Sequence, residues 1–265
     1  MENYLEINRK SWNAKVEPHL KSDFYFVDEF LNGRTSLNSI ELEILGDVSG
    51  KEILHLQCHF GQDSISLSRM GAKVTGIDLS DKAIEAAKEL AQECGTDTHF
   101  LVSDVYELPK ILDKKFDIVY TSYGTIGWLP DLEKWAAVVS HFLKPGGKFV
   151  FVEFHPFVWM YDDDFTHLKY SYFNEMPIVE IEEGTYANQS ADLVQDYVMW
   201  NHPTSDVLNS LLSQNLVLKS FDEYSWSPYA CFRHNDEFEK GKYRIPQLGS
   251  KVPHVFSLVA EKLLN

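Results

Sequence analysis

A histidine-rich loop followed by a distant acidic residue is the part of the sequence best suited to bind a ligand. The segment His55-Leu56-Gln57-Cys58-His59-Phe60-Gly61 comes out of a short apolar run, and Asp78 follows 21 positions after Gln57, behind a second apolar run. An apolar run, a tight loop, a helix, a second apolar run and an acidic residue outline a nucleotide-binding βαβ unit. Two of the glycines expected in such a loop are missing. The first question is therefore whether the loop still binds a nucleoside.

The same loop holds residue types that bind metal ions. His55, Cys58 and His59 are all possible zinc ligands. Their spacing along a strand and a loop does not match a closed zinc set, and no second cluster supplies the remaining ligands. We therefore expect no metal site.

Strand-like and helix-like segments alternate regularly from Lys51 to about His155, and these elements must position the loop. Such alternation is typical of an α/β fold, in which helices cover both faces of a parallel sheet. Right-handed crossovers place the carboxyl ends of all the strands at one edge, where ligands bind. The predicted strands are Glu52 to Leu56, Lys73 to Ile77, Thr98 to Val102, Phe116 to Thr121 and Lys148 to Phe154, and the predicted helices are Ser64 to Met70, Asp81 to Glu93 and Asp131 to Leu143.

The segments outside this alternation have different patterns. Residues 1 to 33 are polar and aromatic, which predicts short helices that form a lid over the core of residues 34 to 155. Residues 156 to 203 predict an antiparallel insertion. Residues 204 to 265 predict a helix followed by two strands that are joined by a non-helical connection. Two strands joined in this way form a closing antiparallel hairpin, which gives the sheet seven strands in total. The elements predicted here are strands Pro177 to Glu182, Leu193 to Met199, Leu216 to Tyr224 and His254 to Glu261, and a helix from Thr204 to Gln214.

Composition excludes several classes of partner. A hydrophobic content of 44% in 265 residues suffices for one large core. The formal net charge of −16 repels phosphate backbones and anionic lipid, so we expect neither nucleic acid nor membrane as a partner. The chain has no long apolar run and no secretory signal, and its three widely spaced cysteines predict no disulfide framework. We expect a soluble, cytoplasmic protein.

The loop and a later turn together resemble one protein family. Where that family reads acidic-x-Gly-x-Gly-x-Gly, this chain reads His55-x-Gln57-x-His59-x-Gly61, and Phe142 to Phe149, with its Lys-Pro-Gly-Gly turn, resembles the family's entry into the fifth strand. The family is the class I S-adenosylmethionine-dependent methyltransferases. The resemblance covers residues 35 to 155 well and 204 to 261 loosely. It implies a Rossmann-like, mostly parallel sheet of seven strands in the order 3-2-1-4-5-7-6, with a helical lid before it and an antiparallel insertion after strand 5.

The resemblance also implies S-adenosyl-L-methionine as the cofactor. Gly61 lets the backbone approach the ligand, and the helix after it offers amide donors to the methionine carboxylate. Gln57 and His59 carry a Cβ and so lose some of glycine's conformational freedom, but polar residues of this kind can be accommodated if φ stays ordinary. Asp78 would bind the ribose, although it could also cap the next helix, and Asp104 would contact the adenine, although it could be a surface turn residue. The expected cofactor-binding residues are Trp12, Gln57, Cys58, His59, Gly61, Asp78, Leu79, Asp104, Val105, Thr121 and Ser122.

Methyl transfer requires little chemistry from the protein, because the sulfonium is already activated and the enzyme mainly aligns an in-line attack. A general base is needed only if the acceptor carries a proton. Glu153 and His155, at the carboxyl end of the fifth predicted strand, are candidates, with His202 and Tyr123 as further ones. His155 could equally serve only to cap the strand by hydrogen bonding. The catalytic residues stay unassigned.

The predicted lid and insertion are rich in aromatic residues, which suits a small organic acceptor, although the same residues could simply pack the cap onto the sheet. We expect a methyltransferase that acts on a small molecule. The alternatives are a catalytically silent, methyltransferase-like binding or regulatory protein and an NAD-dependent oxidoreductase; the missing Gly-x-Gly-x-x-Gly argues against the latter. The acceptor and the oligomeric state stay open. The aromatic residues are Trp12, Phe24, Tyr25, Tyr161, Tyr170, Tyr172, Phe173, Tyr197 and Trp200.

Overall fold

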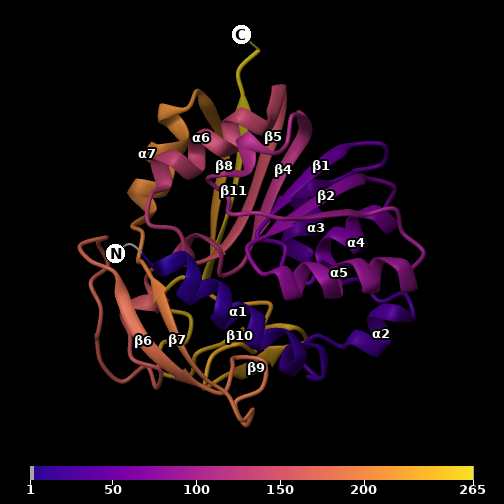
Figure 1. Ribbon diagram of the computed structural model, residues 1–265. Helices are drawn as coiled ribbons and strands as arrows, with labels where there is room; N and C mark the ends of the chain where they lie inside the picture. The colour runs from indigo at the N-terminus through magenta and orange to yellow at the C-terminus, as the bar shows by residue number, and fades with distance from the viewer. Residues whose placement is uncertain (1–2, 265) are drawn as a thin grey trace.

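A seven-stranded sheet forms the centre of the computed structural model, which describes residues 3–264 (Figure 1). The strand order is β3-β2-β1-β4-β5-β11-β8, and β11 alone runs antiparallel to its neighbours β5 and β8. With β8 and β11 counted as the sixth and seventh strands, this confirms the predicted order and the α/β class. The strands are β1 (Glu52–Leu56), β2 (Lys73–Asp78), β3 (His99–Val102), β4 (Phe116–Ser122), β5 (Leu143–Phe154), β8 (Leu216–Tyr224) and β11 (Val255–Lys262).

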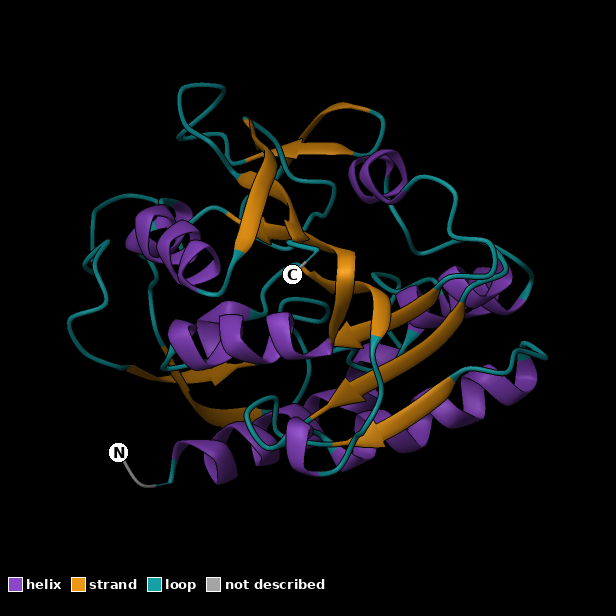
Figure 2. Ribbon diagram, turned by 90° about the horizontal axis from the view of Figure 1, so that it is seen from above, coloured by secondary structure: helices purple, strands orange, loops and turns teal. Residues whose placement is uncertain are grey.

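Helices cover both faces of the sheet (Figure 2). One hydrophobic cluster joins Leu54 and Phe151 of the sheet to Trp135 of α6 and Val207 of α7. Two further clusters bury the opposite face under α3, α4 and α5. Burial on both sides explains why the central strands read as continuous apolar runs in the sequence. The covering helices are α3 (Ser39–Leu45), α4 (Gln62–Arg69), α5 (Asp81–Glu93), α6 (Leu132–Phe142) and α7 (Thr204–Ser213).

The remaining elements lie together at the carboxyl ends of the parallel strands (Figure 1). Asn8 joins the first helix to the insertion, because its Nδ2 donates to the Val198 carbonyl at 2.8 Å and its Oδ1 accepts from the Val198 amide at 2.9 Å. We refer to α1, α2, β6 and β7, with the loops that connect them, as the cap. Its elements are α1 (Tyr4–Leu20), α2 (Val27–Leu31), β6 (Ile178–Glu183) and β7 (Val194–Met199), and the strands β9 (Asp236–Glu239) and β10 (Lys242–Arg244) lie beside it.

Three details differ from the sequence predictions. The lid is not made only of short helices, because α1 has 17 residues, with Pro18 inside its final turn. The non-helical connection between the last two predicted strands contains the β9–β10 hairpin, whose four- and three-residue strands are too short to give a periodic signal. The predicted turn at Lys144 to Gly147 is part of β5, where Gly146 has φ of 74° and the register against β4 shifts.

The antiparallel pairing of β6 and β7 is confirmed. Within residues 3–264, no helix combines the length and the apolar character that crossing a membrane requires.

Candidate active site

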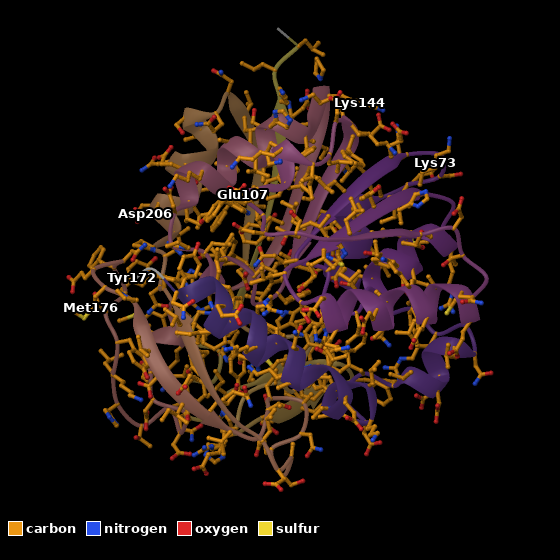
Figure 3. The ribbon with its side chains drawn as sticks, viewed as in Figure 1. Lys73, Glu107, Lys144, Tyr172, Met176 and Asp206 are labelled. Atoms are coloured by element: carbon orange, nitrogen blue, oxygen red, sulfur yellow. The ribbon has the colours of Figure 1, made fainter. Side chains whose placement is uncertain are left out.

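A cavity of about 1530 Å³ lies between the carboxyl ends of the strands and the cap. We call the side formed by the loops after β1, β2, β3 and β4 the sheet wall, and the side formed by α1, β6 and β7 the cap wall. Figure 3 shows Lys73 and Lys144 at the opposite edge of the sheet, where β2 and β5 begin, and Tyr172 and Met176 on the cap side of the molecule. The cavity therefore occupies the edge at which the sequence predicts a ligand.

The loop after β1 keeps the backbone of a glycine-rich loop without its glycines. Gln57 and His59 have φ of 53° and 52°, in the left-handed region that glycine adopts most readily. The loop therefore accommodates these two side chains without the ordinary φ that the sequence analysis set as the condition. The loop is held across to β2, because the Cys58 amide donates to the Ile77 carbonyl and the His59 amide donates to Asp78 Oδ2, both at 2.8 Å. Because these two amides must point toward β2, the loop imposes the positive φ of Gln57 and His59.

The side chains of the same loop line the cavity. Gln57 Nε2 donates to the Thr125 carbonyl at 2.9 Å, whereas its buried Oε1 has no hydrogen-bond partner within residues 3–264. The His59 ring packs edge-on against Trp12, with ring centroids 5.3 Å apart. Burial lowers the pKa of His59 well below its usual value, so this imidazole is neutral at pH 7. The Cys58 thiol is also buried, which raises its pKa and keeps it protonated.

Gly61 is required by space as well as by backbone conformation. Its φ is 79°, and a Cβ at this position would lie 2.5 Å from Phe100 Cζ and 3.0 Å from Ala87 Cβ. Gly61 precedes α4, and within the described residues 3–264 no side-chain hydrogen bond caps the start of that helix. A helix amino terminus with free amides and a favourable dipole is an anion-binding site. The geometry thus suits a carboxylate in the cavity beside Gly61.

Asp78 is the last residue of β2, not the residue after it, and its carboxylate lines the cavity. Oδ2 accepts from the His59 amide and Oδ1 from the Ser80 amide, each at 2.8 Å. A carboxylate has about four lone-pair sites, so capacity for two further donors remains. Burial raises the pKa of Asp78 to about 6. The N-cap residue of α5 is Ser80, whose hydroxyl accepts from the Ala83 amide. Capping of α5 therefore does not explain the presence of a carboxylate at position 78.

The loop after β3 contributes Asp104 and Val105, which line the cavity together with Leu79. Among residues 3–264, the one hydrogen bond found to the Asp104 carboxylate is a long one, 3.3 Å, from the Tyr106 amide. Burial raises the pKa of Asp104. Its oxygens are therefore available to a donor in the cavity, beside the largely buried Val105.

Two of the three residues considered at the end of β4 line the cavity. Ser122 donates to Asp63 Oδ2 at 3.2 Å, and Tyr123 donates to Glu41 Oε2 at 2.8 Å. Thr121 is fully buried, its hydroxyl donates to the Leu56 carbonyl, and it is not part of the cavity wall.

Two carboxylates that the sequence analysis missed support this end of the sheet wall. Burial and the nearby charge of Asp63 raise the pKa of Glu41 to about 7. Glu41 also forms a capping box with Asn38, and this Asn-x-x-Glu pattern is a signal that the sequence does contain.

Glu153 lines the cavity but is occupied by backbone donors. Its carboxylate accepts from the amides of Gly124, Thr125, Ile126 and Phe154 and from the Thr125 hydroxyl. Burial raises its pKa, and these hydrogen bonds act in the opposite direction. A carboxylate with five donors has little capacity to take a proton from an acceptor. Glu153 holds the loop after β4 in place.

The two candidate histidines are also engaged. His155 Nε2 lies 3.0 Å from Glu223 Oε1, its Nδ1 accepts from the Phe157 amide, and the residue is not part of the cavity wall. His202 lines the cavity, but its Nε2 lies 2.7 Å from the Leu129 carbonyl and its Nδ1 lies 3.4 Å from Asn174 Nδ2. Burial lowers the pKa of His202, so it is neutral. Neither ring is free to act as a base in this arrangement.

The cap wall is aromatic, as expected, and contains one buried charge. Trp12 of α1 lies edge-on to Trp128, which belongs to the loop after β4 on the sheet wall, and both line the cavity; Tyr172 and the exposed Phe173 do not. Lys15 reaches the cavity between these rings. Lys15 could not be predicted from the sequence, because a lysine in a polar helix carries no spacing signal. The predicted aromatic residues that line the cavity are Trp12, Phe24, Tyr25, Tyr161, Tyr170, Tyr197 and Trp200.

Comparison with known proteins identifies the sheet and its loops. Residues 53–147 match the family model described as a methyltransferase domain. This part of the chain matches the methyltransferase domain family. S-adenosyl-L-methionine is the cofactor expected of it. The methyltransferase domain contains the loop after β1, Asp78 and Asp104, so the matched residues and the sheet wall coincide.

Several curated proteins and solved structures are similar to this chain. A ubiquinone biosynthesis O-methyltransferase of Coxiella burnetii is 32% identical over 115 residues, which cover 43% of this chain and 47% of that protein. An uncharacterized methyltransferase of Synechocystis sp. is 33% identical over 133 residues, 49% of this chain and 60% of that protein. An S-adenosylmethionine-dependent methyltransferase structure from Mesorhizobium loti has 20% identity and a TM-score of 0.56, and covers 88% of this chain and 100% of that one. The structural likeness supports the fold.

Proposed function

We propose that this chain transfers a methyl group from S-adenosyl-L-methionine to a small organic molecule held between the sheet wall and the cap wall. The observation that carries the proposal is the size and continuity of the cavity. At about 1530 Å³ it exceeds the roughly 300 to 1,000 Å³ typical of a site for one small ligand. One cavity therefore has room for both a cofactor and an acceptor.

The sheet wall offers groups that fit each part of the cofactor. The free acceptor capacity of Asp78 suits the two ribose hydroxyls, and Asp104 suits the adenine amino group. The uncapped amides at the start of α4 suit the methionine carboxylate, and the unpartnered Oε1 of Gln57 suits its ammonium group. These assignments are part of the proposal. When bound, S-adenosyl-L-methionine supplies a methyl group already activated on a sulfonium.

The protein's own contribution is then mainly to hold the reactants in line and to exclude water. Gln57 and Glu153 both bind the loop at Thr125, so the segment between β4 and α6 is fixed relative to the loop after β1. The aromatic cap wall suits the apolar body of an acceptor. No general base is assigned, because Glu153 and His202 are engaged by other partners and His155 lies outside the cavity wall.

Titration calorimetry followed by a transfer assay tests the proposal. Saturable binding of S-adenosyl-L-methionine and of S-adenosylhomocysteine, without binding of NAD, is the expected first result. The expected second result is transfer of label from methyl-labelled cofactor to at least one member of a panel of small aromatic and aliphatic acceptors. Cofactor binding without any transfer would favour the silent binding protein, and no nucleoside binding would overturn the proposal. The cytoplasmic location and the absence of nucleic acid partners stay predictions.

A further inference from the structure

The cap wall contains a cation that is almost completely buried. The Lys15 side chain is 2% exposed, and its Nζ lies 2.6 Å from Glu182 Oε2 on β6. The same Nζ lies 5.0 Å from the ring centroid of Trp12, 5.6 Å from that of Trp128 and 5.9 Å from that of Tyr197. All five residues line the cavity.

The surroundings of this ammonium leave it short of oxygen partners. An ammonium group has three N–H donors, and Glu182 is the one oxygen partner found for it among residues 3–264. The three aromatic faces attract the charge but do not accept a full hydrogen bond. A buried cation of this kind gains from an oxygen anion brought to it by a ligand.

We propose that Lys15 binds a carboxylate of the methyl acceptor, so that the acceptor is a monocarboxylic acid with a flat apolar body. This inference rests on the proposed function and specifies its substrate class. The single charge of the acid matches the single buried cation, and the three rings match the flat body. The ligand's carboxylate accepts from the N–H donors of Lys15 that Glu182 leaves free. The two carboxylates then compete for the charge of one ammonium group.

Benzoate and benzamide test the inference, since they differ only in the charged group. Binding to the protein saturated with S-adenosylhomocysteine is followed by the tryptophan fluorescence of the protein, to which Trp12 and Trp128 beside Lys15 contribute. We expect benzoate to bind with a dissociation constant of about 1 mM and benzamide at least about tenfold more weakly. In Lys15→Met the preference for benzoate should disappear while binding of S-adenosylhomocysteine stays within about threefold.

Glu182→Gln separates a binding role of Lys15 from a purely structural one. Removal of the competing carboxylate should tighten benzoate binding by about threefold to tenfold, and benzoate should raise the melting temperature of this variant more than that of the wild type. If the Lys15–Glu182 ion pair only stabilised the cap, Lys15→Met and Glu182→Gln would have the same effect on benzoate binding.

Three results would overturn the inference. They are equal binding of benzoate and benzamide, unchanged preference in Lys15→Met, and stronger binding of benzylamine than of benzoate, which would make the rings a site for a ligand cation. Failure of S-adenosylhomocysteine to bind would instead contradict the proposed function, so the two failures are distinguishable.

Discussion

The two walls of the cavity are built by different means. The sheet wall depends on backbone geometry: three residues of the loop after β1 have positive φ, and Asp78 is fixed by two amides. The cap wall depends on side chains that meet across long separations, such as Asn8 with Val198 and Lys15 with Glu182. The comparison suggests that the sheet wall is specified locally and can serve one fixed ligand, whereas the cap wall can vary with the acceptor.

Gly61→Ala should produce the largest loss of stability. The new Cβ would combine a left-handed backbone with a 2.5 Å approach to Phe100, at a cost of about 3 kcal/mol. Gly95→Ala is a matched control, because Gly95 has φ of 64° but no atom within 4 Å of the added Cβ. It should cost only about 1 kcal/mol. Urea unfolding of both variants measures the difference, and equal losses would show that space around Gly61 does not limit the loop.

Asp78→Asn should cause the largest loss of binding. Loss of two charge-assisted hydrogen bonds to ribose hydroxyls predicts about 100-fold weaker binding of S-adenosylhomocysteine. Asp97→Asn is the control, since Asp97 is exposed and precedes β3 at the opposite edge of the sheet. Calorimetry on both variants, after their thermal unfolding has been compared, gives the result. A change of less than about threefold in Asp78→Asn would remove the ribose assignment.

Asn8→Ala should affect the cap wall alone. The change leaves the buried amide and carbonyl of Val198 without partners and should cost about 2 kcal/mol. Asn32→Ala removes an exposed bond to the Asp28 carbonyl and should cost about 0.5 kcal/mol. Urea unfolding gives both values. Binding of S-adenosylhomocysteine should stay within about threefold in Asn8→Ala; a loss as large as in Asp78→Asn would mean that the two walls are not separable.

Adenosine binding should depend on pH through the sheet wall. Because the pKa of Asp78 is raised to about 6, the carboxylate that accepts from the ribose is lost as the pH falls through that value. Affinity should then fall about tenfold per pH unit below about 6. The raised pKa means that the folded state binds this proton more tightly than the unfolded state, so protonation of Asp78 itself favours folding. Calorimetry from about pH 7 to about pH 5 should show the fall without unfolding, and a flat profile would contradict it.

His59→Gly and His59→Ala should differ by the smallest amount. Both changes remove the imidazole, but only alanine keeps a Cβ at φ of 52°. The glycine variant should be more stable by about 1 kcal/mol in urea unfolding. An alanine variant of equal or greater stability would show that the backbone at position 59 is not left-handed.

The sheet wall could be predicted from sequence far better than the cap wall. Strand runs, helix ends and the positions of Asp78 and Asp104 are local patterns, and they sufficed for the strand order once the family resemblance was added. The positive φ of Gln57 and His59 could not be predicted, because their residue types disfavour it and only the amide bonds to β2 impose it. Glu153 was a candidate base because of its position at the end of a predicted strand. Its four backbone donors could not be predicted, because they reach its carboxylate only in the folded chain.

The residues of the cap wall could be predicted from the sequence even less well than the details of the sheet wall. Lys15 and Glu182 are 167 positions apart, and neither belongs to a motif. The aromatic content of the cap was visible in the sequence. Which rings face the cavity was not, since Trp12 and Tyr197 line it while the exposed Phe173 does not. Long-range packing decides these orientations.

A crystal structure of the complex with S-adenosylhomocysteine tests the division of the cavity most directly. The account predicts ribose hydroxyls at Asp78, the adenine beside Asp104, the amino-acid end near Gln57 and Gly61, and open space between the sulfur and Lys15. A nucleoside bound against Trp128 and Tyr197, with Asp78 free of ligand, would contradict it.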